Sequence, residues 1–471
     1  MLANNNKYIL SLILAMGSAM LVGCGETTDK AEAEPVKINL NPFPSRYQVI
    51  DYPPVLFINA NVLDGVGGYY ENTSVLIKSG KIVSIGEQPD TPSDTNVVDA
   101  KGKWLTPGII DVHSHLGVYP TPTGNAHSDG NEATAPVTAQ VWAEHSIWPQ
   151  DPGFQRALAG GVTAMQILPG SANLVGGRGV TVKNMPATTV QDMKFPDAPY
   201  GLKMACGENP KRVYGSKGGP STRMGNVAGY RQSWADAQDY QRNWDKYYAD
   251  FAAGKDPKVP KRDLKLETLA LALKGDILVH MHCYRADDMG TMLDVMKEFN
   301  YKISTFHHAV ESYKIADRLA TEGVCSAMWA DWWGFKLEAY DGIQENIPMV
   351  HAAQACAIVH SDSELGIQRL NQEAAKAWAN GKRAGLNISE ADAWRWLSSN
   401  PAKALGIFAQ TGSIENGKNA DLVLWSSNPF STYAQAEEVY IDGALVFDRN
   451  NPAMWPVSDF ELGQPGEGDS K

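Results

Sequence analysis

The sequence predicts an α/β protein: a (β/α)8 TIM barrel with a small β-sandwich domain built from both chain ends. In the middle of the chain, about 300 residues alternate short apolar, β-rich runs with helical patterns, and eight such units close a barrel. The two flanking regions, residues 54–99 and 420–448, contain strand patterns without helical periodicity. With 471 residues, 43% of them hydrophobic and 20% charged, the chain is long and apolar enough for a barrel with an accessory domain.

The first residues have the pattern of an export signal. Lys7 precedes an apolar run, residues 8–21, which is short for a membrane span but has the length of a signal-peptide core. The sequence Leu-Val-Gly-Cys at 21–24 then resembles the bacterial lipobox, whose Cys becomes the lipidated first residue of the mature protein. We therefore expect residues 1–23 to be a lipoprotein signal peptide and Cys24 to carry a lipid. The alternative is an ordinary cleaved signal with a chance Cys.

The domain boundaries follow from changes in composition. Residues 24–48 are acidic, polar and Pro-containing, which is typical of a tether. The β-sandwich is expected at 49–105 and 411–450, the barrel at 106–410 and a tail at 451–471. We expect the protein in the bacterial cell envelope, lipid-anchored at the outer membrane and facing the periplasm.

Strands and helices are expected in alternation along the folded part. The predicted sandwich strands are 55–58, 75–77, 82–85, 420–425 and 439–448. The predicted barrel strands are 108–112, 163–168, 181–183, 201–205, 277–281, 303–306, 324–328 and 357–360, and the predicted helices are 233–253, 287–299, 312–322, 365–379 and 390–400. The segment 215–265 is interpreted as an insertion, because it is longer than a minimal crossover between strands.

Charge and cysteine usage narrow the functional classes. With 41 Lys+Arg against 53 Asp+Glu, the net charge is −12, which argues against nucleic acid as the main partner. Four cysteines remain after Cys24, and each lies in an apolar stretch, so buried free thiols are expected rather than bridges: Cys206, Cys283, Cys325 and Cys356.

A pair of histidines carries the strongest chemical signal. His113 and His115 end an apolar strand, and residues two apart in a strand point to the same side. Both imidazoles can therefore reach one ion, and zinc and similar metals favour such nitrogen ligands. Four later strand ends also carry ligand-type residues, and the chemistry of a barrel comes from those ends. The sequence thus predicts a metal site at the barrel mouth.

These motifs resemble those of the amidohydrolase superfamily. Residues 107–115, Pro-Gly-Ile-Ile-Asp-Val-His-Ser-His, look like its first-strand motif, near the imidazolonepropionase-like branch. Residues 417–423, Gly-Lys-Asn-Ala-Asp-Leu-Val, resemble the return into a split β domain, and residues 400–406, Asn-Pro-Ala-Lys-Ala-Leu-Gly, resemble the last-helix motif. The resemblance covers about residues 54–450 and is specific at the level of the superfamily, not of the substrate.

The resemblance implies a bridging ligand on the fourth strand. Residues 201–205, Gly-Leu-Lys-Met-Ala, look like the branch in which a carboxylated lysine, here Lys203, bridges two metals. A lysine near two dications is driven to the neutral amine, which can trap carbon dioxide. Glu208 is the rival bridging ligand, because other branches use Glu there.

The resemblance also implies the remaining ligands. On strand five it selects His282, which leaves His280 one layer deeper as a packed core histidine. On strand six it selects His308, and since adjacent strand residues face opposite ways, only one of His307 and His308 can enter the site directly. On strand eight it gives Asp362, which contacts one metal and handles the proton; capping of the next helix is the alternative.

Other polar residues are candidates for substrate binding. Several follow barrel strands and would suit a substrate carboxylate: Arg178, Tyr214, Arg223 and Arg285. The Gly-rich stretch 169–179 lacks the Lys-Ser/Thr ending of a phosphate loop. Trp329, Trp332 and Trp333, with Asp331, would form a pocket wall. Three histidines without such context are read as structural or exposed: His127, His145 and His351.

The resemblance implies a metal-dependent hydrolase of a carbon–nitrogen bond in a small amide, with a dipeptide or an N-acyl amino acid as the first expectation. Two divalent ions, expected to be zinc, would activate water beside a Lys203 carbamate, and Asp362 would act as general base and acid. One alternative is a single metal on His113, His115, His282 and Asp362, opening a cyclic amide or deaminating a ring. Another is a lipoprotein that binds a small molecule without catalysis. A homo-oligomer is compatible with all three.

Overall fold

The computed structural model describes residues 34–86, 91–121, 123–332 and 334–455. The chain separates into two units, Met1–Asn39 and Leu40–Lys471, and the elements described below belong to the second. The predicted signal peptide 1–23, Cys24 and part of the predicted tether lie outside the described residues. Within the described ranges, no helix combines the length and the apolar character that a membrane span requires.

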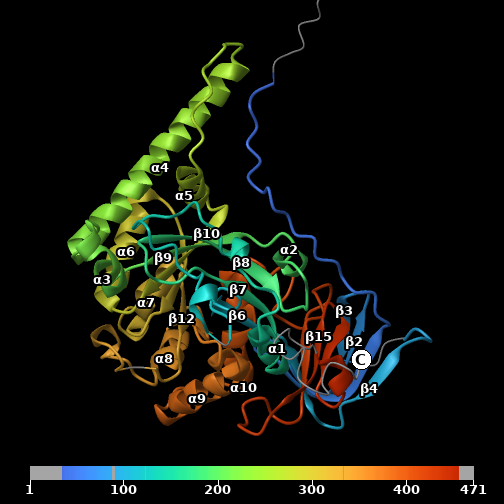
Figure 1. Ribbon diagram of the computed structural model, residues 1–471. Coiled ribbons are helices and arrows are strands. Elements are labelled where there is room, and N and C mark those ends of the chain that lie inside the picture. The colour runs from blue at the N-terminus through green and yellow to red at the C-terminus, as the bar shows by residue number, and fades with distance from the viewer. Residues whose placement is uncertain (1–33, 87–90, 122, 333, 456–471) are drawn as a thin grey trace, which may run out of the picture. The chain divides into compact units, whose positions relative to one another are not determined.

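The central part of the chain forms a nearly closed eight-stranded barrel sheet, which confirms the predicted fold class (Figure 1). Its strands follow one another around the barrel in sequence order. They are β6 (Ile109–Ser114), β7 (Val162–Ile167), β8 (Val175–Lys183), β9 (Tyr200–Ala205), β10 (Ile277–Cys283), β11 (Ile303–His308), β12 (Cys325–Met328) and β13 (Ala357–Val359). Each is buried along most or all of its length, as expected for strands covered by helices.

One strand departs from the all-parallel barrel that the sequence predicts. β8 runs antiparallel to both β7 and β9. Residues 168–174 turn the chain directly back from β7, a connection that antiparallel pairing allows and parallel pairing does not. The predicted strand 181–183 is only the end of β8, because half of the Gly-rich stretch 169–179 belongs to the same strand.

The barrel closes between its last and first strands through side chains. No backbone ladder joins β13 to β6 in the part of the chain that is described. Instead, Ser361 N–H donates to Asp111 Oδ1 at 3.2 Å, the Ser361 hydroxyl bonds Asp111 Oδ2, and Asp362 N–H donates to the His113 carbonyl at 3.0 Å. This seam holds the backbone of Asp362 directly against the strand that carries His113.

The helices surround the barrel, and one of them projects from it (Figure 1). The predicted insertion, residues 215–265, contains α4. This helix begins at Arg223, ten residues before the predicted helix, because Thr222 Oγ1 caps it by accepting from Gly225 N–H at 3.1 Å. The α-helices are α1 (Pro152–Ala159), α2 (Val190–Met193), α3 (Glu208–Tyr214), α4 (Arg223–Ala252), α5 (Leu264–Lys274), α6 (Ala286–Phe299), α7 (Ala316–Glu322), α8 (Asn346–Ala352), α9 (Leu370–Arg383), α10 (Glu390–Trp394) and α11 (Ser399–Ala404). Short 3-10 helices are η1 (Asn125–His127), η2 (Ala143–His145), η3 (Gly215–Lys217), η4 (Ser312–Lys314), η5 (Leu337–Ala339), η6 (Gly366–Arg369), η7 (Arg395–Leu397) and η8 (Pro452–Met454).

A separate sheet combines strands from both chain ends, as predicted. Its order is β16-β15-β14-β5-β1-β2-β3, with β4 also paired to β1. The strands are β1 (Val55–Leu63), β2 (Tyr69–Lys78), β3 (Lys81–Gly86), β4 (Asn96–Asp99), β5 (Trp104–Pro107), β14 (Leu422–Trp425), β15 (Ala436–Ile441) and β16 (Ala444–Asp448). The predicted strand 439–448 is a hairpin of β15 and β16, because Asp442 and Gly443 form a turn between them, and both residues have positive φ, as a tight hairpin of this kind requires.

A buried ion pair connects this sheet to the barrel. Lys183, the last residue of β8, is buried, and its Nζ lies 2.6 Å from Asp442 Oδ2 and 3.5 Å from Asp421 Oδ1. The ammonium group also lies over the rings of Tyr47 and Phe195. Because a buried cation is costly without such partners, this contact fixes the hairpin against the barrel.

The expectation of free thiols is wrong. Cys206 is bonded to Cys283, and Cys325 to Cys356. An apolar sequence context predicts burial but does not distinguish a thiol from a bridge, and the fold brings each pair together at neighbouring strands, with Cα separations of 5.3 and 4.4 Å. The first bridge links the residue after β9 to the last residue of β10.

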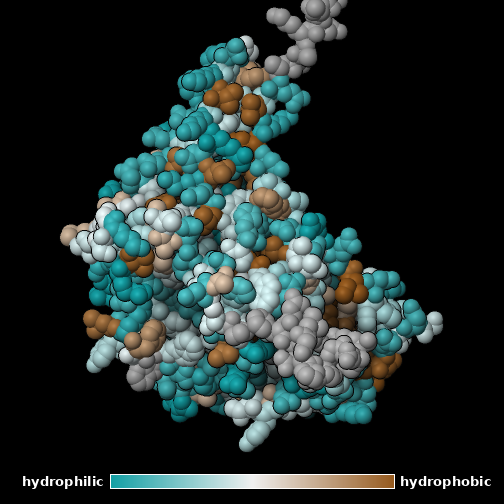
Figure 2. Space-filling model, in the orientation of Figure 1, coloured by the Kyte–Doolittle hydropathy of each residue, from teal (hydrophilic) through white to brown (hydrophobic). Residues whose placement is uncertain are grey.

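The surface seen in Figure 2 is mainly hydrophilic, with hydrophobic residues scattered over the projecting helix and the body. Exposed hydrophobic side chains of α4 and of the segment after it include Met224 and Val259.

Candidate metal centre

Four side chains predicted to bind metal converge at one end of the barrel. His113 Nε2 lies 3.2 Å from His115 Nε2, 3.1 Å from Lys203 Nζ and 3.3 Å from Asp362 Oδ1. His115 Nε2 is also 3.1 Å from Asp362 Oδ1. The residues come from β6 and its end, from β9, and from the segment after β13, so the fold gathers them from distant parts of the sequence. Imidazole nitrogens and a carboxylate oxygen that face one another at this range suit a shared cation.

Two further histidines lie next to this group. The rings of His282 and His308 have centroids 4.6 Å apart, and His308 Nδ1 is 3.7 Å from Asp362 Oδ2. The Nδ1 atoms of both histidines are buried and have no hydrogen-bond partner within the described residues. Buried nitrogens left in this state fit a second ion beside the first.

Strand geometry alone does not explain how His308 reaches the site. His307 pairs with His282 across β10 and β11, and its ring lies against those of His113 and His280. His308 reaches the centre as well, because its backbone has φ 68° and leaves the regular alternation of the strand. His308 thus lies beside Asp362, whereas His307 lies behind His113, between His113 and His280.

His360 was not among the predicted ligands, and the structure explains its place. Ring nitrogens of His113, His308 and His360 lie within 4.8 Å of one another. However, His360 Nε2 accepts the backbone N–H of His308 at 3.1 Å. A neutral imidazole that accepts at Nε2 carries its proton on Nδ1, so no lone pair remains for a metal. His360 thus fixes the unusual backbone conformation of His308. In the sequence, its position at a strand end, two residues before Asp362, was the signal for a role near the metal centre.

Burial prepares these groups to bind metal at neutral pH. It lowers the pKa of Lys203 to about 7, although the carboxylate of Asp362 opposes the change. Burial also lowers the pKa of His113 far below its usual value, so its imidazole stays neutral. For Asp362 burial acts in the opposite direction, but the hydrogen bond from His115 and nearby positive charges outweigh it and hold its pKa below the usual range. A neutral amine, neutral imidazole and ionised carboxylate are the forms that coordinate metal.

Aromatic side chains form a wall beside His308. Its ring stacks on Trp329 at a centroid distance of 4.4 Å and on Tyr284 at 5.2 Å, and Trp332 stacks on Trp329 at 5.2 Å. A small cavity opens between His308, Trp329 and Trp332. The Nζ of Lys336 lies 3.8 Å from the centre of the Tyr284 ring. The tryptophan cluster thus lies where the pocket wall was expected, except that Trp333 is outside the described residues.

The predicted substrate residue Arg178 lies elsewhere. In the β8–β9 ladder, Gly177 is opposite Lys203 and Arg178 is opposite Leu202, so Arg178 points away from the barrel interior. Its Nε donates to Thr268 Oγ1 at 2.9 Å, and its guanidinium stacks over Trp142 at 4.1 Å. The reason is that Arg178 lies within β8, on the outward side of the strand, and not in a loop that follows a strand end.

The other predicted substrate residues and the rival bridging ligand are engaged outside the histidine group. Tyr214 is buried at the end of α3, and Arg285 is paired with Asp287 at 2.8 Å. Arg223 is paired with Asp288 at 3.0 Å and with Glu338. Glu208 lies 3.4 Å from Lys336. The geometry therefore brings Lys203, and not Glu208, among the other candidate ligands.

His127, His145 and His351 also lie apart from the group: His127 and His145 are exposed, and His351 accepts from Trp396 Nε1 at 3.1 Å.

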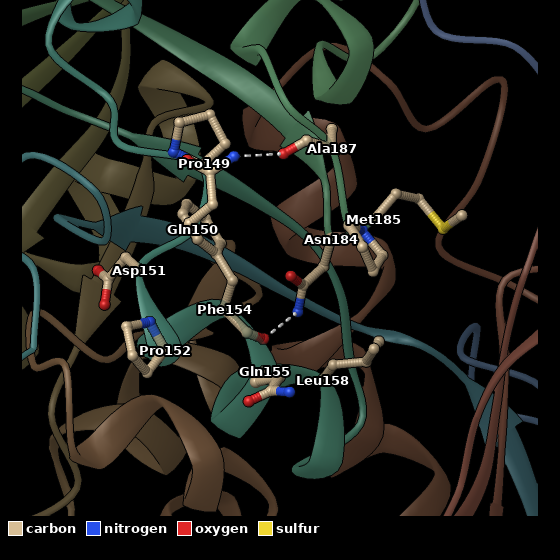
Figure 3. A pocket seen from close by; sticks show the side chains of 11 residues that line it. Pro149, Gln150, Asp151, Pro152, Phe154, Gln155, Leu158, Asn184, Met185 and Ala187 are labelled. Atoms are coloured by element: carbon tan, nitrogen blue, oxygen red, sulfur yellow. Dashed lines mark hydrogen bonds between the residues drawn. The ribbon is translucent and has the colours of Figure 1, made fainter. Parts of the chain in front are cut away.

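A larger pocket lies away from the histidines (Figure 3). It is lined by α1, the residues before it and the segment after β8, where Gln150 Nε2 donates to the Ala187 carbonyl at 3.1 Å and Asn184 Nδ2 to the Phe154 carbonyl at 3.1 Å. Its one carboxylate, that of Asp151, accepts backbone N–H groups of Gly153 and Gly117 at 2.9 and 2.8 Å. Because Asp151 is used as a helix cap, this pocket offers no comparable chemistry.

The barrel fold and the candidate ligands together indicate one class of protein, and comparison with known proteins agrees. The Amidohydrolase family model matches residues 104–451. The chain therefore belongs to the amidohydrolase family, which confirms the predicted superfamily.

Individual relatives agree with this assignment. The amidohydrolase tasK of Hapsidospora irregularis is 35% identical over 405 residues, which is 82% of this chain but 41% of that protein. The chain thus spans less than half of that relative. The crystal structure of an amidohydrolase from Thermotoga maritima has 39% identity and a TM-score of 0.76, and covers 84% of this chain and 100% of its own. The imidazolonepropionase of Colwellia psychrerythraea is 41% identical over 73 residues, 13% of this chain and 18% of that protein.

Proposed function

We propose that the protein is a metal-dependent hydrolase that cleaves a carbon–nitrogen, amide-type bond of a small substrate. The observation that carries the proposal is the convergence of His113, His115, Lys203 and Asp362 within 3.1 to 3.3 Å contacts at the barrel mouth. Membership of the amidohydrolase family supports it.

The chain offers ligands for two divalent ions, with zinc as our proposal. His113, His115 and Asp362 would hold one ion, and His282 and His308 the other. Lys203 would span both as a carbamate, since its pKa of about 7 leaves a large share of neutral amine at neutral pH. The amine nitrogen would bond the carbon of carbon dioxide and release a proton, which gives two oxygens, one for each ion.

When bound, the ions would supply Lewis acidity toward water and toward the scissile carbonyl. Asp362 would accept the proton of the attacking water and deliver it to the leaving amine. Its backbone N–H is held by the His113 carbonyl and its Oδ1 lies 3.1 Å from His115 Nε2, so the carboxylate is fixed where this transfer is needed. Trp329 and Tyr284 would pack against the substrate and limit the access of bulk water.

For the substrate we propose a small amide, with a dipeptide or an N-acyl amino acid first. The local similarity to an imidazolonepropionase favours a second candidate, the opening of a cyclic amide by a single-metal centre.

We also propose that the protein is exported and lipid-anchored at Cys24. Two disulfides in the folded part support export, because such bonds persist in oxidising compartments such as the periplasm.

The proposed activity is tested by loading the purified protein with zinc and measuring amine release from a panel of dipeptides, N-acyl amino acids and cyclic amides. Turnover should require metal and should fall strongly in Asp362→Asn. His127→Gln is the matched control and should keep full activity, because His127 is exposed and lies apart from the site. Equal turnover by metal-free and metal-loaded protein, or none with any substrate, would contradict the proposal.

A further inference from the structure

Three buried histidines form a row that runs from the candidate metal centre into the barrel. His113 Nδ1 lies 3.0 Å from His307 Nδ1, and His307 Nε2 lies 3.0 Å from His280 Nδ1. All three side chains are fully buried. The row ends at His280 Nε2, which has no hydrogen-bond partner in the described part of the chain. His307 and His280 are not among the proposed ligands, so the proposed chemistry leaves them without a role.

The position of one proton determines all the others along this row. A neutral imidazole carries a single N–H, and a metal on His113 Nε2 requires that proton to be on Nδ1. His113 Nδ1–H then donates to His307, so the His307 proton is on Nε2 and donates to His280. The His280 proton is in turn on Nε2. In the opposite direction His113 would accept at Nδ1 and carry its proton on Nε2, where it would block the metal.

When each histidine of the row donates away from the metal centre, His280 Nε2–H needs an acceptor. Gln166 lies near enough to provide one. Gln166 on β7 is fully buried, and neither atom of its amide has a hydrogen-bond partner among the described residues. A Cβ on Gly201 would lie 2.7 Å from Gln166 Nε2 and 3.0 Å from His280 Cδ2, the ring atom next to Nε2. Both side chains thus pack around the same glycine, and exchange of the amide nitrogen and oxygen puts the oxygen beside Gly201, where the His280 ring also lies.

We infer that His307, His280 and Gln166 form a positioning relay that selects the metal-binding tautomer of His113. The inference rests on the proposed metal centre and deepens it. The three residues would touch neither metal nor substrate and would act through His113. Gly201 is part of the arrangement, because any side chain there would separate Gln166 from His280.

Two substitutions of Gln166 separate this role from a structural one. Gln166→Leu removes the acceptor, and we expect metal affinity, measured by competition with a chelator, to fall about 10- to 100-fold, as for other partners of metal-bound histidines. Gln166→Glu keeps an acceptor oxygen and should bind metal within a few-fold of wild type. Thermal unfolding should rank the two in the opposite order, because Glu buries a charge and Leu does not. If Gln166 only supported the fold, the two variants would rank in the same order for metal affinity and for thermal stability.

Matched controls and a direct probe complete the test. Gly201→Ala should weaken metal binding, whereas Gly290→Ala should not, because a Cβ on Gly290 in α6 meets only Arg318 Nη1, at 3.5 Å. Nitrogen-15 NMR of the zinc-loaded protein should show His307 and His280 with their protons on Nε2. The relay is overturned if Gln166→Leu binds metal as tightly as wild type, or if His280 carries its proton on Nδ1. If wild type itself binds no metal, the proposed metal centre is overturned together with the relay.

Discussion

The strongest test of the proposed centre is the replacement of Lys203 by Ala. If the Lys203 carbamate bridges two ions, wild type should hold about two metals per chain, as in paired-metal sites. Lys203→Ala should lose the second metal and most activity. Small carboxylates such as acetate should partly restore both, because their two oxygens can stand in for those of the carbamate.

The pKa of Lys203 determines how strongly carbamate formation should depend on pH. Burial disfavours the ammonium form and lowers the pKa from 10.5 to about 7, so the share of neutral amine increases as pH rises through 7. That share is about one tenth at pH 6 and about nine tenths at pH 8. At fixed dissolved carbon dioxide, carbamate formation in the metal-free protein should therefore be about tenfold faster at pH 8 than at pH 6.

The assay removes the metal, adds zinc with or without bicarbonate at both pH values, and counts metal per chain. Lys183→Met is the matched control, because Lys183 is an equally buried lysine with Asp442 as its partner. It should lower stability by about 3 to 5 kcal/mol and leave metal content unchanged. The reasoning is refuted if Lys203→Ala keeps both metals. Should Glu208→Ala lose one instead, the bridge belongs to Glu208.

Three further outcomes are expected. His115→Ala should lose metal and activity together, measured by elemental analysis and turnover, because a site with few protein ligands tolerates no loss; full occupancy would make His115 structural. Replacing Cys206 and Cys283 by Ser should lower the free energy of unfolding by about 2 to 5 kcal/mol, as for other native disulfides, and an unchanged denaturation midpoint would contradict this. Cys24→Ser should leave the membrane fraction and lack the mass of acyl chains, whereas membrane association equal to that of wild type would refute lipidation.

The sequence predicted which candidate ligands lie together, because the barrel places strand ends together regardless of their separation along the chain. His113 and His115 could be paired by the two-residue period of a strand, and the structure shows their Nε2 atoms 3.2 Å apart. Lys203 and Asp362 could be added only through family resemblance, since no local pattern links either of them to the histidines.

The substrate residues and the cysteines were beyond the reach of sequence patterns. Arg178 was assigned from its position in a Gly-rich stretch after the strand 163–168, but it lies inside β8, a strand that forms by pairing with β7 and β9. In the same way, the pairing of Cys206 with Cys283 depends on β9 and β10 being neighbours. His308 was selected by resemblance, although its positive φ is a property of the folded chain.

The reversed strand β8 has a consequence for the order in which the barrel assembles. A parallel pair forms only after a long connection has been closed, whereas β7 and β8 are joined by residues 168–174 and pair as a hairpin. Such local contacts form early in folding. β9 then adds antiparallel to β8, which sets Lys203 against Gly177 before the distant strands with His282 and Asp362 arrive. The lysine side of the centre would thus serve as the template on which the remaining ligands are assembled.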